Sequence, residues 1–188
     1  MDTRSIIPYG RQHISEEDIS AVVNVLRSDW LTQGPAVPAF EQALAKLCDA
    51  RHAIVVNSAT SALHIACLAL GVGPDDRVWT TPNTFVASAN CARYCGAEID
   101  FVDIDPVTMN LSVSDLAVRL EKAKKSSTLP KVVIPVHFAG LPCDMKAIHE
   151  LSQIYGFRII EDASHALGAQ YWGEPIGNCR YSDVTVFS

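Results

Sequence analysis

The chain is organised around the stretch Phe157-Arg158-Ile159-Ile160-Glu161-Asp162-Ala163-Ser164-His165-Ala166. Gly156 ends a helical pattern, and residues 157–160 form a short, largely apolar pattern that predicts a strand. Two carboxylates follow at once, and an imidazole comes three residues after Asp162. Ligands of open α/β sheets bind outside the carboxyl ends of the strands. The stretch therefore predicts a ligand site at Asp162; the simpler alternative is that Glu161 and Asp162 only cap the segment that follows.

Strand patterns alternate with helix patterns over most of the chain. Two helices are expected first, one starting at Ser15 with a near capping box and one with Pro35 in its first turn. This alternation predicts an α/β fold with a mostly parallel sheet and helices on both faces. The expected strands are 53–56, 77–80, 99–104, 132–136, 157–160 and 184–187, and the expected helices between them are 58–70, 84–94, 114–125 and 145–155.

Length and composition restrict the class of protein. The 188 residues suffice for one α/β domain with a core, and the hydrophobic content of 48% is ordinary for a globular protein. A net charge of -6 argues against nucleic acid as the main partner. No stretch resembles a signal peptide or a membrane span, and the six cysteines form no CxxC pair, so we expect a reduced, cytoplasmic protein without a metal site.

A second chemical signal, Asn57-Ser58-Ala59-Thr60-Ser61-Ala62, directly follows the first expected strand. Ser58 or Thr60 can cap the next helix, whose positive end then offers backbone N–H groups to an anion. The segment has neither the GxxxxGK[ST] of a nucleotide-binding P-loop nor the GxGxxG of a dinucleotide site. The alternative is a helix cap with no ligand.

A third signal, Pro82-Asn83-Thr84-Phe85-Val86-Ala87-Ser88, also follows a strand. Phe85 could cover the face of a planar ligand, or it could be a core residue of its helix. All three signals fall at one edge of the expected sheet. Together they predict a pocket for a phosphorylated, planar, cationic ring, and pyridoxal phosphate (PLP) fits best because a carboxylate keeps its pyridine nitrogen protonated.

Several segments carry a resemblance to a known family. The chain resembles the DegT/StrS-type nucleotide-sugar aminotransferases, which have the aspartate-aminotransferase fold (PLP transferase fold type I). The resemblance extends from Ile7-Pro8-Tyr9-Gly10 to Ser188. The segments that carry it are SDWLTQGP from Ser28, NSATSALH from Asn57, TPNTFVASAN from Thr81, FVDID from Phe101, PVH from Pro135 and EDASHALGA from Glu161.

The resemblance implies roles for individual residues. Ala59 and Thr60 would bind the cofactor phosphate. Phe85 would stack on the cofactor ring, Asp162 would pair with the ring nitrogen as a catalytic group, and His165 would contact the phenolic oxygen. Independently of the family, His137 at a strand end could line the same pocket or could be a structural histidine.

Ser188 resembles the family's serine that also touches the phosphate. In the family a Schiff-base lysine follows this serine by a few residues, and none of the six lysines of this chain occupies that position. We therefore expect residues 1–188 to be the N-terminal segment and most of the PLP-binding large domain. The C-terminal small domain is then absent, the large domain is incomplete, and the chain alone is inactive.

The resemblance is strongest to the pseudaminic-acid branch of the family. It implies PLP-dependent transfer of an amino group from glutamate to a UDP-linked 4-keto-6-deoxy-N-acetylhexosamine by a homodimeric full-length protein. The alternatives are a perosamine-type enzyme acting on another nucleotide keto sugar, a relative that acts as a dehydratase, and a non-catalytic fragment that keeps only the fold.

Overall fold

The computed structural model describes residues 10–188, so the Ile7–Tyr9 part of the opening motif lies outside the described residues. The chain divides into two compact units, one ending at Phe40 and one spanning Glu41–Ser188. The helices are α1 (Glu16–Leu26), α2 (Ala36–Cys48), α3 (Ala59–Ala69), α4 (Ala87–Tyr94), α5 (Val113–Ser126), the 3-10 turn η1 (Phe138–Gly140) and α6 (Met145–Tyr155). The strands are β1 (Arg77–Thr80), β2 (Glu98–Phe101), β3 (Val132–Ile134), β4 (Arg158–Asp162), β5 (Gln170–Tyr171), β6 (Glu174–Pro175) and β7 (Val184–Val186).

The first two helices start where their capping residues predict. Ser15 caps α1 by accepting a hydrogen bond from the backbone N–H of Asp18, and the Asp18 carboxylate accepts one from the backbone N–H of Ser15. This is a complete capping box. Helix α2 begins at Ala36, directly after Pro35, whose missing N–H costs nothing at a helix start.

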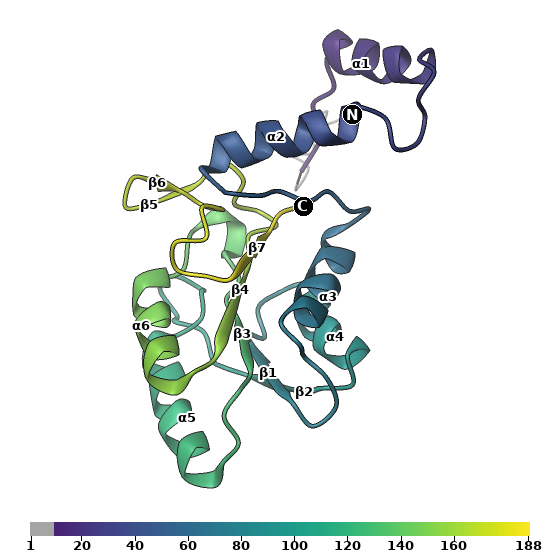
Figure 1. Cartoon of the computed structure of the whole chain (residues 1–188). Helices are drawn as coiled ribbons and strands as arrows, with labels where there is room; N and C mark the ends of the chain where they lie inside the picture. Colours follow the sequence, from purple (N-terminus) through teal and green to yellow (C-terminus); the bar gives the residue numbers. More distant parts are fainter. Residues whose placement is uncertain (1–9) are drawn as a thin grey trace, which may run out of the picture. The chain divides into compact units, whose positions relative to one another are not determined.

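Within residues 10–188, a sheet of five parallel strands has the order β2-β1-β3-β4-β7. Helices α3 and α4 cover one face of this sheet, and α5 and α6 cover the other, as Figure 1 shows. The predicted α/β class, with a mostly parallel sheet between two helical layers, is therefore confirmed. In each helical layer, the helices bury their apolar stripes against one face of the sheet.

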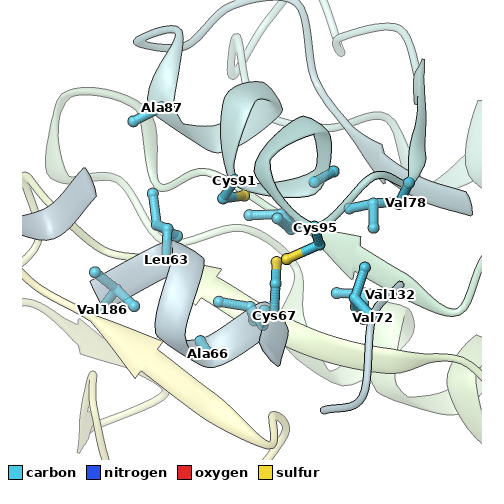
Figure 2. Close-up of a cluster of buried hydrophobic side chains, with 14 residues drawn as sticks. Leu63, Ala66, Cys67, Val72, Val78, Ala87, Cys91, Cys95, Val132 and Val186 are labelled. Carbon is cyan, nitrogen blue, oxygen red and sulfur yellow. The ribbon is translucent and has the colours of Figure 1, made fainter. Parts of the chain in front are cut away.

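The two faces of β4 pack into different cores. Ile160 belongs to the cluster between the sheet and helices α3 and α4, where Leu63 and Val186 are also buried (Figure 2). Ile159 belongs to the cluster on the α5 and α6 face. Burying one such aliphatic side chain stabilises the fold by about 1.5–3 kcal/mol. Because side chains alternate along a strand, Asp162 lies on the α3 and α4 side, and Glu161 lies on the opposite side.

Several element boundaries differ from the sequence prediction. Residues 53–56 were expected to form a strand, and this prediction is wrong for the described part of the chain. The backbone N–H of Val55 is bonded to the carboxylate of Glu41 instead of to a neighbouring strand, and Ile54 is 81% exposed. The strand expected over 99–104 ends at Phe101, and the helix expected from Thr84 begins at Ala87.

The hairpin of β5 and β6 has no counterpart among the expected elements. Trp172 and Gly173 connect its strands, and both have positive φ, of 53° and 81°. Two successive left-handed residues match the right-handed twist of a hairpin, and glycine supplies one of them without strain. Gly173 was the available sequence signal for this turn.

Candidate functional site

The candidate residues lie at one edge of the sheet because all the main strands are parallel. Phe85 follows β1, His137 follows β3, His165 follows β4 and Ser188 follows β7. The edge where these strands end is the one at which open α/β sheets bind ligands.

Helix α3 presents its N-terminus to the same edge. Its other end is held at the opposite edge, where Lys131, just before β3, donates a hydrogen bond to the carbonyl of Gly71. The Ser58 hydroxyl caps the helix by accepting a hydrogen bond from the N–H of Ser61. Among the described residues no partner satisfies the N–H groups of Ala59 and Thr60, both half-buried. The predicted anion site at Ala59 and Thr60 therefore has its donors available.

Asp162 is the last residue of β4 and is 4% exposed. Its Oδ2 accepts a hydrogen bond of 2.6 Å from the Ser88 hydroxyl. Its Oδ1 accepts two hydrogen bonds from Ser164, at 2.7 Å from the hydroxyl and 3.2 Å from the backbone N–H. The carboxylate is therefore held at both oxygens by neutral donors.

No lysine, arginine or histidine between residues 10 and 188 forms an ion pair with Asp162. A buried carboxylate is costly unless it is paired with a cation or richly hydrogen-bonded. Asp162 thus places a negative charge at the ligand-binding edge of the sheet, where a cationic group of a ligand could pair with it. The alternative that Asp162 only caps the next segment accounts for its bonds to Ser164, but not for its burial beneath α4.

Glu161, the neighbouring residue of β4, is hydrogen-bonded at both of its oxygens by side chains of the protein. Its Oε2 lies 2.8 Å from Nε2 of His137, while its Oε1 accepts hydrogen bonds from the hydroxyls of Ser182 and Thr185. Nδ1 of His137 accepts a hydrogen bond from the backbone N–H of Cys143, so the ring proton lies on Nε2 and is donated to Glu161. His137 is 1% exposed and is a buried structural histidine, not an open pocket residue.

The thiol of Cys143, beside His137, is an inert part of the core. Its Sγ donates to the carbonyl of Val136 at 3.2 Å. Burial raises the pKa of Cys143 to about 12, so the sulfur stays protonated near neutral pH. It therefore offers no nucleophile.

Phe85 lies in the turn before α4 and is 74% exposed. The possibility that it is a core residue is therefore excluded, and its ring is available to a planar ligand. His165 and Ser188 are also exposed.

Sequence reasoning missed two residues of the site, Ser88 and Thr84. Both fell inside the quoted Pro82–Ser88 segment, but Ser88 looked like an ordinary residue of the following helix. A hydroxyl on an apolar helix face was the available signal, because a buried hydroxyl needs a hydrogen-bond partner.

Comparison with known proteins identifies the family. The model of the DegT/DnrJ/EryC1/StrS aminotransferase family matches residues 12–188. The chain belongs to this aminotransferase family. Protein MJ1066 of Methanocaldococcus jannaschii, whose name calls it uncharacterized, is 41% identical over all of this chain and 47% of its own length.

Solved aminotransferases share the fold. PseC of Helicobacter pylori, an aminotransferase involved in the biosynthesis of pseudoaminic acid, superposes with a TM-score of 0.87 and is 31% identical, over 96% of this chain and 47% of PseC. Spr1654 of Streptococcus pneumoniae, named as a sugar aminotransferase and solved in its PLP form, has a TM-score of 0.83 and 30% identity, over 97% of this chain and 48% of its own. The family member described here thus spans about half the length of these relatives.

In the described part of this family member, no helix is long and apolar enough to cross a membrane.

Proposed function

We propose that this chain forms the cofactor-binding part of a PLP-dependent sugar aminotransferase. The observation that carries the proposal is Asp162, a buried carboxylate with neutral donors at both oxygens and no cationic partner within residues 10–188. A pyridinium would supply the missing positive charge, whereas a neutral ring would leave the carboxylate uncompensated. When bound, PLP supplies the electron sink for amino-group transfer.

The other residues suit the remaining parts of the same cofactor. Ala59 and Thr60 would bind the phosphate through the N-terminus of α3, with Ser188 as a further hydroxyl donor. The exposed ring of Phe85 would cover one face of the pyridine, and His165 would contact its phenolic oxygen. Each role comes from the family resemblance and suits the position of the residue at the carboxyl edge of the sheet.

The proposed substrate of the full-length protein is a UDP-linked 4-keto-6-deoxy-N-acetylhexosamine, and the proposed amino donor is glutamate. The support is the likeness to PseC, which spans nearly the whole of this chain, together with the PseC-like segment from Asn57. A perosamine-type enzyme for a GDP-linked keto sugar is the competing specificity within the family.

A homodimer is part of the proposal. Ile65 and Leu68 on α3 and Tyr94 on α4 are about half exposed, at 50%, 54% and 55%. These two helices pack against each other, and exposed large apolar side chains favour association.

The experiment is an amino-transfer assay on the full-length protein that contains this chain. The protein is incubated with PLP, glutamate and either the UDP-linked or the GDP-linked keto sugar, and amino sugar and 2-oxoglutarate are measured together. Equal amounts of both products from the UDP sugar are expected. Turnover of the GDP sugar alone would assign the perosamine-type specificity, and loss of a sugar hydroxyl with no amino sugar formed would assign dehydration.

A further inference from the structure

Ser88 lies in the first turn of α4 and its side chain is completely buried. Its hydroxyl oxygen lies 2.6 Å from Oδ2 of Asp162, a residue 74 positions later in the chain. The same oxygen lies 2.7 Å from the hydroxyl of Thr84 and 3.3 Å from the carbonyl of Phe85. Figure 2 shows the neighbouring residue, Ala87, in the core cluster that fixes this end of α4.

The direction of these hydrogen bonds follows from their acceptors. A serine hydroxyl has one proton, and the charged oxygen of Asp162 is both its nearest and its strongest acceptor. Ser88 therefore donates to Asp162, and the Thr84 hydroxyl must donate to Ser88. The result is a directed chain, Thr84 to Ser88 to Asp162, that starts in the turn that carries Phe85.

The two oxygens of Asp162 are not equally protected. Oδ1 keeps a backbone N–H donor from Ser164 whatever side chain stands there. Oδ2 has the Ser88 hydroxyl as its one donor within the described chain. Without that hydroxyl, the carboxylate would be held only at Oδ1 by Ser164, and a buried charged oxygen would lack a donor.

We propose that Ser88 is a positioning residue that orients the Asp162 carboxylate toward the ring nitrogen of the cofactor, with Thr84 fixing the direction of the Ser88 proton. This inference rests on the proposed function, since it requires that Asp162 faces a pyridinium. It goes beyond that function because it places the control of the Asp162 geometry in α4. One hydroxyl, that of Ser88, then links the turn that carries Phe85 to the strand that carries Asp162.

The test measures recognition of the ring nitrogen and does not need catalysis. Pyridoxamine 5'-phosphate and its 1-deaza analogue, in which carbon replaces the ring nitrogen, are titrated by calorimetry into the full-length protein that contains this chain. The ratio of their affinities reports the contact with Asp162, since the phosphate and ring contacts cancel. In Ser88→Ala we expect this ratio to fall by about tenfold, the scale of a hydrogen bond to a charged group.

Three variants show whether the effect is specific. Ser152→Ala removes another buried hydroxyl, which donates to the carbonyl of His149 on α6, and it should leave the ratio unchanged. Ser88→Thr keeps a hydroxyl and should retain most of the discrimination. Thr84→Val removes the donor to Ser88 and should lower the ratio by about two- to threefold, because hydrogen-bonded hydroxyls in a chain reinforce one another.

Each outcome decides one of the two proposals. If the unaltered full-length protein does not prefer pyridoxamine 5'-phosphate to the deaza analogue, the proposed role of Asp162 fails and the role of Ser88 fails with it. If the unaltered protein discriminates and Ser88→Ala discriminates equally well, only the role of Ser88 is overturned. Should Ser88→Ala not fold, as judged by circular dichroism, Thr84→Val decides, and an unchanged ratio there overturns the hydrogen-bond chain.

Discussion

Nε2 of His137 lies 2.8 Å from Oε2 of Glu161, and both side chains are buried. Glu161 lies on the face of the sheet that α5 and α6 cover. The adjacent carboxylate, Asp162, points to the other face of the same strand and has no such partner among the described residues. The hydrogen bonds of Glu161 all lie within the protein and stabilise the sheet edge, whereas we propose that the charge of Asp162 meets a cationic ligand group.

The first prediction concerns this buried pair. His137→Ala should lower the free energy of unfolding by about 3 kcal/mol, because it removes a hydrogen-bond donor from the buried Glu161 carboxylate. Urea denaturation measures the loss. Lys146→Ala is the matched control, since the exposed pair of Lys146 and Glu150 at 3.6 Å should contribute less than about 1 kcal/mol. Equal losses in the two variants would contradict the assigned stabilising role of His137.

A second prediction concerns the turn after β3. Gly140 has a φ of +86°, and a Cβ at this position would lie 2.8 Å from the backbone oxygen of His165. Gly156 has a similar φ of +80°, but a Cβ there would meet nothing within 4 Å. Gly156→Ala should therefore cost only the left-handed strain of about 1–2 kcal/mol. Gly140→Ala should cost more and should also displace the backbone at His165; thermal melts that rank the two variants in the reverse order would refute this account.

The third prediction concerns the lysines of this chain. Lys131 donates hydrogen bonds to the carbonyl of Gly71 and the carboxylate of Asp76. Lys146 forms an ion pair with Glu150, and the Nζ atom of Lys124 lies 5.7 Å from the centre of the Tyr155 ring. Within residues 10–188 no lysine contacts Asp162. Treating the 188-residue chain with PLP and borohydride should therefore give sparse labelling scattered over surface lysines. Stoichiometric labelling of one lysine by mass spectrometry would show that a lysine of this segment serves the cofactor.

A fourth prediction concerns catalysis by the full-length protein. Asp162→Asn removes the counter-charge of the ring nitrogen and weakens the electron sink. We expect the amino-transfer rate to fall by about a hundredfold or more, which corresponds to about 3 kcal/mol in the barrier. Rates are measured at saturating cofactor, so that weaker binding does not mimic a slower reaction. A variant that turns over at the unaltered rate with its cofactor bound would remove Asp162 from its proposed role.

Local signals in the sequence predicted much of the fold. The capping box of Ser15 and Asp18 and the glycine cap at Gly156 each depend on residues only a few positions apart. Helix α6 accordingly has the predicted bounds, Met145–Tyr155. Residues 53–56 have the composition of a strand, but pairing depends on a neighbour that local sequence does not specify. Their backbone at Val55 bonds to Glu41 instead.

The candidate site was predictable only in outline. The parallel sheet explains why Asp162 and Phe85 belong to the same edge, because the ends of parallel strands meet there. The link from Ser88 to Asp162 joins residues that are distant in sequence, so the hydroxyl on the apolar face of α4 could signal that Ser88 needs a partner but not which one. The pairing of His137 with Glu161 was hidden for the same reason, so His137 remained a pocket candidate until the structure showed it buried.

The central claim is that Asp162 holds the positive charge of a pyridinium, and the protonation state of the ring nitrogen tests it most directly. Pyridoxamine 5'-phosphate labelled with ¹⁵N in the ring is bound to the full-length protein that contains this chain, and its nitrogen chemical shift is recorded near neutral pH. We predict the shift of a protonated pyridinium in the unaltered protein and that of a neutral pyridine in Asp162→Asn. A neutral pyridine shift in both, with the cofactor bound, would contradict the assignment of Asp162 as its counter-charge.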